Sequence, residues 1–103
     1  KLIGSIVFII FLIPFKLIAY SETDIRIFEA TGECNRCNLE KSAFIKKDLR
    51  RSKLRDSFLR GSNFSLSDLS ISDLSLSDMR AANMTNILAM RSDFSFSDMT
   101  GSK

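Results

Sequence analysis

The sequence of 103 residues contains no histidine, no tryptophan, a single proline and only two cysteines. Histidine is the commonest general base and a frequent zinc ligand, so its absence excludes most Ser-His-Asp hydrolases and most zinc sites. The length suffices for one domain and no more. We therefore expect a small protein that is not an enzyme and that holds neither a cofactor nor a metal ion.

The N-terminus carries the one long apolar run of the chain. Lys1 precedes a mainly apolar stretch from Leu2 to Phe15, and Ala19 and Ser21 stand at positions −3 and −1 of a cut before Glu22. Lys16 interrupts the run before it reaches the about 20 apolar residues that a membrane-spanning helix needs. Residues 1–21 are therefore predicted to be a signal peptide, and a membrane anchor is the weaker alternative. The protein is expected to be exported to the periplasm or the extracellular space and to meet a membrane only transiently, through this leader.

Cys34 and Cys37 form a C-x-x-C pair directly after the leader and a short polar segment. Thiols of exported proteins usually end as disulfides, which favours a structural bridge between the two. A zinc ion would lack at least two of its usual ligands. A redox pair of the thioredoxin type needs a βαβ setting, which this sequence does not show. The structural bridge is the favoured interpretation, and thiol-disulfide redox chemistry is kept as an alternative.

From Leu39 onward a large apolar residue returns at every fifth position without an insertion. We call these positions centres; the residue two positions before a centre is mostly Ser, and the residue directly before it is mostly Asp or Asn. An internal repeat of this regularity dominates the prediction of the fold. The centres are Leu39, Phe44, Leu49, Leu54, Leu59, Phe64, Leu69, Leu74, Met79, Met84, Ala89, Phe94 and Met99.

A period of five fits neither an α-helix nor a long strand. In a helix each step of five advances the centre by about 140°, so no buried stripe would form. In a simple strand an odd repeat would move the centres to alternating faces. A short in-out-in segment followed by a two-residue corner solves this, with Ser and the centre pointing inward and Asp or Asn pointing outward. We expect Asp, Asn and Gly to tolerate the tight backbone of such corners.

The segments SDLSISDLSLSDM and SDFSFSDM resemble the A/S-D/N-L-x-x units of the pentapeptide-repeat family. The preceding ATGECNRCNL is similar to the C-x-x-C segment before the repeats of many exported members. This resemblance implies an all-β fold, a right-handed quadrilateral β-helix with 20 residues in each coil and about three coils here. It then divides the chain into the leader 1–21, an N-terminal segment 22–36, the β-helix 37–101 and a tail 102–103.

The segment from Thr23 to Glu33 has acidic residues early, Gly32 near its end as a stop, and the apolar residues Ile25, Ile27, Phe28 and Ala30. This pattern predicts a short amphipathic helix that caps the first coil. Lys47 occupies a position that should point inward. Its stem is expected to run toward the open end of the first coil, which keeps the ammonium group in water.

Basic residues concentrate in the first part of the repeats. Residues 41–60 hold eight basic and two acidic residues, a net charge of +6, whereas residues 61–103 hold three basic and five acidic, a net charge of −2. Because they lie on successive faces, the basic residues are predicted to form a belt, which is more often a solvated surface than a binding site. As a functional alternative, the belt would bind an anionic glycan or lipid. Its candidate residues are Lys46, Arg50, Arg51, Arg55 and Arg60.

Apolar residues also occupy outward positions near the C-terminal end: Leu66, Ile71, Leu76 and Phe96. Leu76 and Phe96 fall in one column of the expected coils. Together with Met99 they are the candidate interface, because stacked exposed apolar side chains mark contact surfaces. Family members often form dimers through their C-terminal coils, so the resemblance implies a homodimer or a contact with another, unidentified protein.

Nucleic acid is not an expected partner. Some relatives protect DNA gyrase with a long acidic rod shaped like a duplex, whereas this chain is short, basic in its first coil and led by an export signal. The periodic serines are predicted to form the wall of the coil, with no base beside them. The sequence therefore predicts a structural or protein-interaction module whose specific role it does not define.

Overall fold

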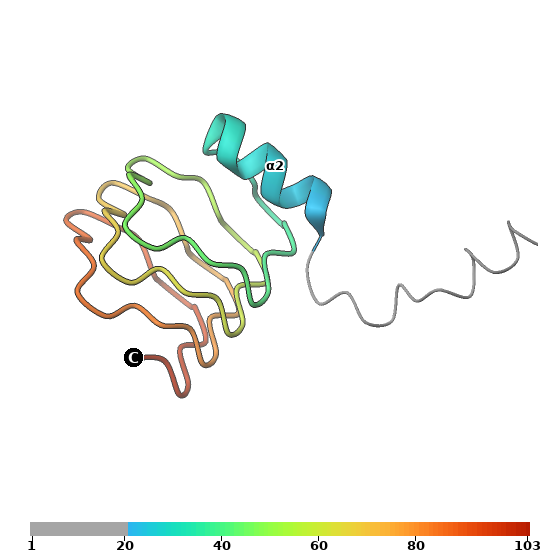
Figure 1. Ribbon diagram of the computed structural model, residues 1–103. Coiled ribbons are helices and arrows are strands. Elements are labelled where there is room, and N and C mark those ends of the chain that lie inside the picture. Colours follow the sequence, from blue (N-terminus) through green and yellow to red (C-terminus); the bar gives the residue numbers. More distant parts are fainter. Residues whose placement is uncertain (1–20) are drawn as a thin grey trace, which may run out of the picture.

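The computed structural model describes residues 21–103 (Figure 1). Of the predicted leader only Ser21 belongs to this part, and residues 1–20 lie outside the described residues. Within residues 21–103, no helix combines the length and the apolar character that a membrane span requires.

Helix α2, Glu22–Thr31, precedes the repeats. Its first turn is capped by Ser21, whose hydroxyl accepts the amide N–H of Asp24 at 3.2 Å. Its end is set by Gly32, which adopts a left-handed conformation with φ of 69° and donates its N–H to the carbonyl of Phe28. The predicted helix with a glycine stop is confirmed. A cut before Glu22 would remove the residue that caps the helix.

The repeat region winds into stacked coils (Figure 1). Its described residues form isolated parallel bridges, each between residues 20 positions apart, from Glu33 with Lys53 to Asp78 with Asp98. Each bridge is a single residue because two-residue turns flank every straight segment. The bridges fall into four columns, which define four faces of the solenoid. The predicted in-out-in path with a corner every five residues is thereby confirmed.

Backbone hydrogen bonds join each coil to the next in a regular pattern. The N–H of a centre donates to the carbonyl 19 residues ahead, as from Phe44 to Asn63 at 2.7 Å. The N–H of the residue before a centre donates back to the preceding coil, as from Asn63 to Ser42 at 2.8 Å. These bonds satisfy the peptide groups between coils, which allows such short segments to form a stable sheet.

We number the faces by their columns of centres. The core is the stack of these columns, closed at the N-terminal end by Phe28 of α2, which packs edge-on against Phe44 with ring centroids 5.2 Å apart. Face 1 carries Leu39, Leu59, Met79 and Met99; face 2 carries Phe44, Phe64 and Met84; face 3 carries Leu49, Leu69 and Ala89; face 4 carries Cys34, Leu54, Leu74 and Phe94.

The inward serines hold neighbouring coils together. The hydroxyl of Ser77 accepts the N–H of Ser57 and donates to the carbonyl of Leu54 at 2.7 Å. Ser67 bridges Lys47 and Phe44 in the same way. Their side chains are buried, so these bonds satisfy backbone groups that water does not reach. The serine column thus supplies polar links inside an otherwise apolar wall.

The corners differ from the expectation that Asp, Asn and Gly would adopt their unusual backbone. The left-handed residue is the second one after each centre, with φ between 56° and 72°, and it is mostly a larger residue, such as Arg51, Ile71 or Phe96. Asp and Asn stabilise the corner through their side chains instead. Asp68, for example, accepts the N–H of Ser70 at 2.9 Å through its carboxylate. The prediction was wrong about the positions: Asp and Asn stand directly before the centre and supply a side-chain acceptor, whereas the left-handed residue is a different one, two positions after the centre.

Candidate functional site

Cys34 and Cys37 lie where α2 meets the first coil. Their sulfur atoms are paired in the structure, with Cα atoms 5.4 Å apart, and both residues are buried. Cys34 is also the first member of the face 4 column. The repeat of large apolar residues did not indicate this, because cysteine is small. The hydroxyl of Ser57 accepts the N–H of Cys37 and donates to the carbonyl of Cys34. The pair therefore forms part of the packed core rather than an exposed reactive site.

Asp24 of α2 approaches this pair, which sequence reasoning did not anticipate. A carboxylate oxygen of Asp24 and the two sulfur atoms lie within 4.8 Å of one another. The same carboxylate accepts the N–H of Asn38 at 2.8 Å, and the sulfur of Cys34 lies 3.4 Å from the Asp24 carbonyl oxygen. With the sulfurs paired and the carboxylate bonded to backbone, this arrangement fastens the helix to the first coil.

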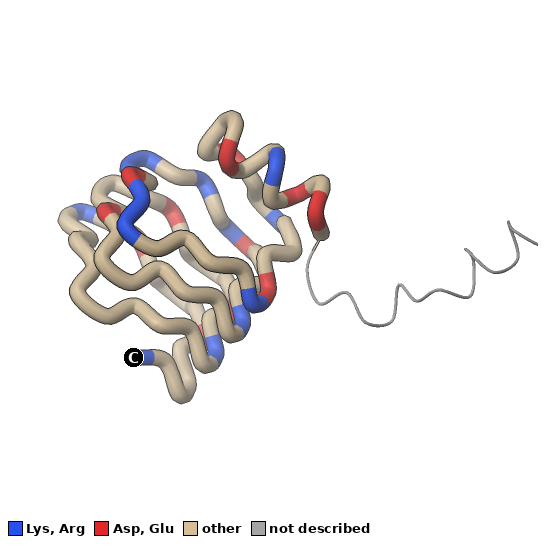
Figure 2. The backbone as a smooth tube through the Cα atoms, in the orientation of Figure 1, with Lys and Arg blue, Asp and Glu red and all other residues tan. Residues whose placement is uncertain are grey.

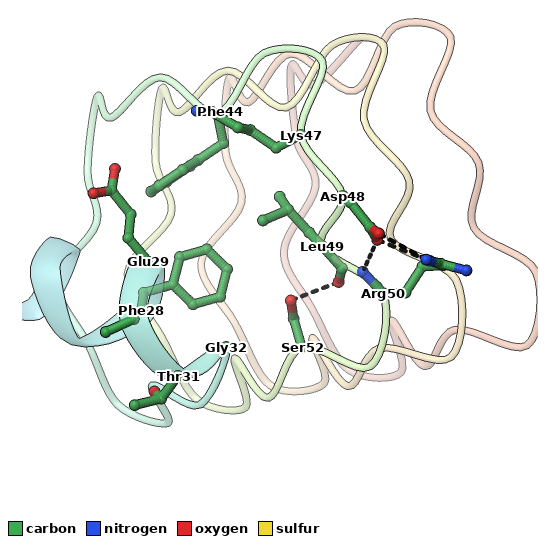
Figure 3. Close-up of a pocket in the computed structure, with 11 residues that line it drawn as sticks. Phe28, Glu29, Thr31, Gly32, Phe44, Lys47, Asp48, Leu49, Arg50 and Ser52 are labelled. Atoms are coloured by element: carbon green, nitrogen blue, oxygen red, sulfur yellow. Dashed lines mark hydrogen bonds and ion pairs between the residues drawn. The ribbon is translucent and has the colours of Figure 1, made fainter.

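A groove of about 410 Å³ opens beside the C-terminal half of α2 (Figure 3). Phe28 and Phe44 form its apolar side, and the half-buried Leu49 forms its floor. Lys47 lines the rim and is exposed, as expected for a stem that runs toward the open end of the coil. The helix covers Phe44 but leaves the face 3 column partly open, so the cap closes only part of the first coil.

The five predicted belt residues do not converge on one site. All five stand in the two-residue corners: Lys46 between faces 2 and 3, Arg50 and Arg51 between faces 3 and 4, Arg55 between faces 4 and 1, and Arg60 between faces 1 and 2. All five are exposed. Figure 2 shows basic positions at several places round the coil nearest α2. A belt rather than a single flat patch is what the structure contains.

Arg50 is the belt residue with the strongest acidic partner. Its guanidinium donates two hydrogen bonds to the carboxylate of Asp48, at 2.8 and 2.7 Å (Figure 3). These bonds and the N–H of Arg50 lower the pKa of Asp48 from 3.8 to about 2. Arg50 also reaches Asp68 of the next coil at 4.0 Å. Its charge is therefore largely compensated by the protein itself.

The candidate interface residues lie at the C-terminal end but on different parts of it. Leu76 and Phe96 occupy successive corners of face 4, and their exposed fractions are 44% and 88%. Met99 is a centre of face 1, and its exposed fraction of 37% contrasts with 0% for Leu39, Leu59 and Met79 in the same column. Within residues 21–103 nothing covers the core at this end.

The exposed apolar residues Leu88 and Met90 were not predicted from the sequence. Leu88 and Met90 flank the centre Ala89 on face 3, with exposed fractions of 61% and 73%. Face 3 carries Asp48 and Asp68 in the column of Leu88, and Arg50 and Ser70 in the column of Met90. The signal was therefore present in the sequence, as apolar residues in columns that are otherwise charged or polar.

A parallel β-helix with four faces, five-residue segments and inward serines defines a class of solenoid proteins built from pentapeptides. Residues 33–70 match the family model described as Pentapeptide repeats (8 copies). Residues 33–70 of this chain therefore match the pentapeptide-repeat family, whose members fold as right-handed quadrilateral β-helices.

Two solved structures of pentapeptide repeat proteins are similar to this chain. The protein alr5209 from Nostoc Pcc 7120 is 28% identical, with a TM-score of 0.48 over 84% of this chain and 76% of that chain. Rfr23 from the cyanobacterium Cyanothece 51142 is 14% identical, with a TM-score of 0.38 over 79% of this chain and 92% of that chain. No curated protein matches the sequence.

Proposed function

We propose that this protein is an exported, non-enzymatic module of about three coils that acts by binding another protein, in the first place a second copy of itself. The observation that carries the proposal is the exposed core at the C-terminal end. Met99 is partly exposed there, and Phe96 beside it is almost fully exposed. Apolar groups at such a position gain most from contact with another molecule.

The peptide groups of the last coil support the same proposal. The backbone N–H groups of Phe94, Phe96 and Met99 donate no hydrogen bond within residues 21–103. Their equivalents in the coil before, Leu74, Leu76 and Met79, donate to carbonyl groups of the next coil. An open row of donors beside exposed apolar side chains is a template for pairing with a second chain.

Two properties support a module without catalytic activity. Histidine is absent from the sequence, so no imidazole base is available to any serine. The inward hydroxyls of Ser57, Ser67 and Ser77 donate to backbone carbonyls and are buried. They are thereby occupied in holding the coils together.

Export is proposed from the leader, residues 1–21, and from the paired Cys34 and Cys37. The redox alternative requires an accessible sulfur, but the exposed fractions of Cys34 and Cys37 are 3% and 8%. Thiol titration of the folded, exported protein tests the redox alternative. We expect no reactive thiol before or after challenge with a mild reductant, and a rapidly reduced pair would favour the redox alternative.

Association is tested by light scattering with the double variant Leu76→Asp/Phe96→Asp. Aspartate tolerates the left-handed corner backbone, so the fold is expected to survive. We expect the wild type to scatter as a dimer and the variant as a monomer. Phe58→Asp is the matched control, because Phe58 has an exposed fraction of 51% but lies near the N-terminal end of face 1. An unchanged mass of the double variant would contradict the proposal.

A further inference from the structure

Face 3 carries a second surface that the proposed association does not use. We propose that this face binds the surface of a bilayer that contains anionic lipids. In this arrangement Leu88 and Met90 enter the headgroup layer, while Arg51 and Arg91 contact lipid phosphates.

The apolar part of this surface covers the C-terminal half of face 3. Leu88 stands on the face itself, Met90 stands at the corner that follows it, and Leu66 and Ile71 stand at the two corners of the coil before, with exposed fractions of 50% and 49%. Four large apolar side chains exposed close together exceed the single, scattered apolar residues that are normal on a protein surface. Side chains that protrude from a flat face reach into an interface without bending the backbone.

The charges of face 3 match an anionic surface. Lys46, Arg51 and Arg91 are exposed at its corners and form no ion pair among residues 21–103. The acidic residues of the face, Asp48 and Asp68, are already engaged by Arg50 and by corner amides.

Faces 1 and 4 also bring a cation without an ion pair in residues 21–103 beside an exposed apolar side chain, Arg60 with Phe58 and Arg55 with Leu76, but both faces carry more acidic residues than face 3. Face 4 carries Asp73 and Asp93, and Arg80 on face 1 is paired with Asp78 and Asp98. Unpaired cations beside protruding apolar residues are what an anionic bilayer surface binds.

The backbone of face 3 is hydrogen-bonded between its second and third coils. The N–H groups of Leu69 and Ile71 donate to the carbonyls of Leu88 and Met90, at 2.7 and 2.8 Å. The N–H of Met90 in turn donates to the hydroxyl of Ser70. Peptide groups that are hydrogen-bonded to one another keep their partners when contact with a membrane removes water from the face.

A second copy of the chain is a poorer occupant of this face. A symmetric contact would place the same patch on both partners and bring Arg51 and Arg91 of each copy close to those of the other. Like charges at an interface disfavour association, whereas lipid phosphates would neutralise them. The same cations therefore favour a bilayer over self-association.

Cosedimentation of the full chain with vesicles tests the proposal. Vesicles of phosphatidylcholine alone are compared with vesicles of equal parts phosphatidylcholine and phosphatidylglycerol, at low and at high salt. We expect binding to the anionic vesicles only, weakened at high salt. Leu88→Ser/Met90→Ser should reduce binding by about tenfold or more, and Arg51→Gln and Arg91→Gln should each reduce it about fivefold.

Leu76→Ser/Phe96→Ser is the matched control, because it removes two exposed apolar residues from face 4 and should bind vesicles like the wild type. Circular dichroism and thermal unfolding of every variant show whether it is folded. The proposal is overturned if the wild type ignores anionic vesicles, or if the charge variants lose binding while Leu88→Ser/Met90→Ser keeps it, which would indicate a soluble polyanion. A lower oligomeric mass of Leu88→Ser/Met90→Ser would also overturn it, by assigning face 3 to a protein contact.

Discussion

Ser57 lies directly beneath Cys37 in the next coil, and its hydroxyl joins two segments of the chain. It accepts the N–H of Cys37 at 3.1 Å and donates to the carbonyl of Cys34 at 3.0 Å. Ser57 therefore supports the C-x-x-C segment from inside the core, where water does not replace a lost partner.

Replacing this serine should destabilise the fold. Ser57→Ala leaves the buried N–H of Cys37 and the carbonyl of Cys34 without that partner, which should lower the free energy of unfolding by about 1–3 kcal/mol. Denaturant unfolding measures the change. Ser42→Ala is the matched control, because Ser42 is buried in the same kind of position but its hydroxyl has no partner in the structure. Equal losses for the two variants would show that the hydrogen bonds of Ser57 contribute nothing.

Relief of corner strain should stabilise the protein. Ile71 has φ of 62°, and Ile71→Asn replaces a β-branched residue by one that adopts this conformation readily. We expect the free energy of unfolding to rise by about 1 kcal/mol. Gly61→Val makes the opposite change at an equivalent corner, where φ is 66°, and should destabilise the protein. A less stable Ile71→Asn would mean that the side chain of Ile71 contributes to packing.

Stability should fall in acid through the corner aspartates. Hydrogen bonds from Arg50 lower the pKa of Asp48 to about 2, and bonds from Ser70 and Arg80 lower the pKa values of Asp68 and Asp78. Because the unfolded chain binds protons more readily at these groups, stability is fully present above the ordinary value of 3.8 and is lost as the pH falls toward 2.

Thermal unfolding at a series of pH values checks this dependence. Asp48→Asn keeps an oxygen that accepts the N–H of Arg50 but no longer titrates, so its melting temperature should vary less with pH in this range. A melting temperature of the wild type that is constant between pH 4 and 2 would contradict the assignment of these groups.

The helix should depend on one aromatic contact. Phe28 has an exposed fraction of 1% and packs edge-on against Phe44, which is stacked on Phe64. Phe28→Ala should cost about 3–5 kcal/mol and release α2 from the first coil. Unfolding and the helical signal in circular dichroism report both effects. Ile27→Ala is the control, because the side chain of Ile27, next to Phe28 in the helix, is 44% exposed. A similar loss of stability in this variant would indicate that helix propensity, and not packing, holds α2.

Much of the fold was predictable because the residues within each five-residue unit decide the local conformation of that unit. The inward serine, the outward Asp or Asn and the apolar centre repeat without an insertion from Leu39 to Met99, so a single local path explains all of them. The helix end at Gly32 was likewise readable, since a glycine after an amphipathic segment is a local stop signal. These are features for which neighbours in sequence decide the conformation.

The site was less predictable because it depends on residues that meet only after the coils stack. Leu88 lies beside Asp68 and Met90 beside Ser70, each 20 residues away, and their exposure follows from that register. The pairing of Arg50 with Asp48 removes one belt residue from the free cations, which composition does not reveal. Asp24 reaches the cysteine pair only because α2 folds back over the first coil.

By itself, the sequence determined the repeat, its period and the direction in which each side chain of a unit points, because these follow from short-range sterics and burial. The tertiary structure alone decided which residues share a face, which charges neutralise one another and which end of the core is covered. Stacking at a 20-residue offset creates those neighbours, and α2 closes only the N-terminal end of the described solenoid.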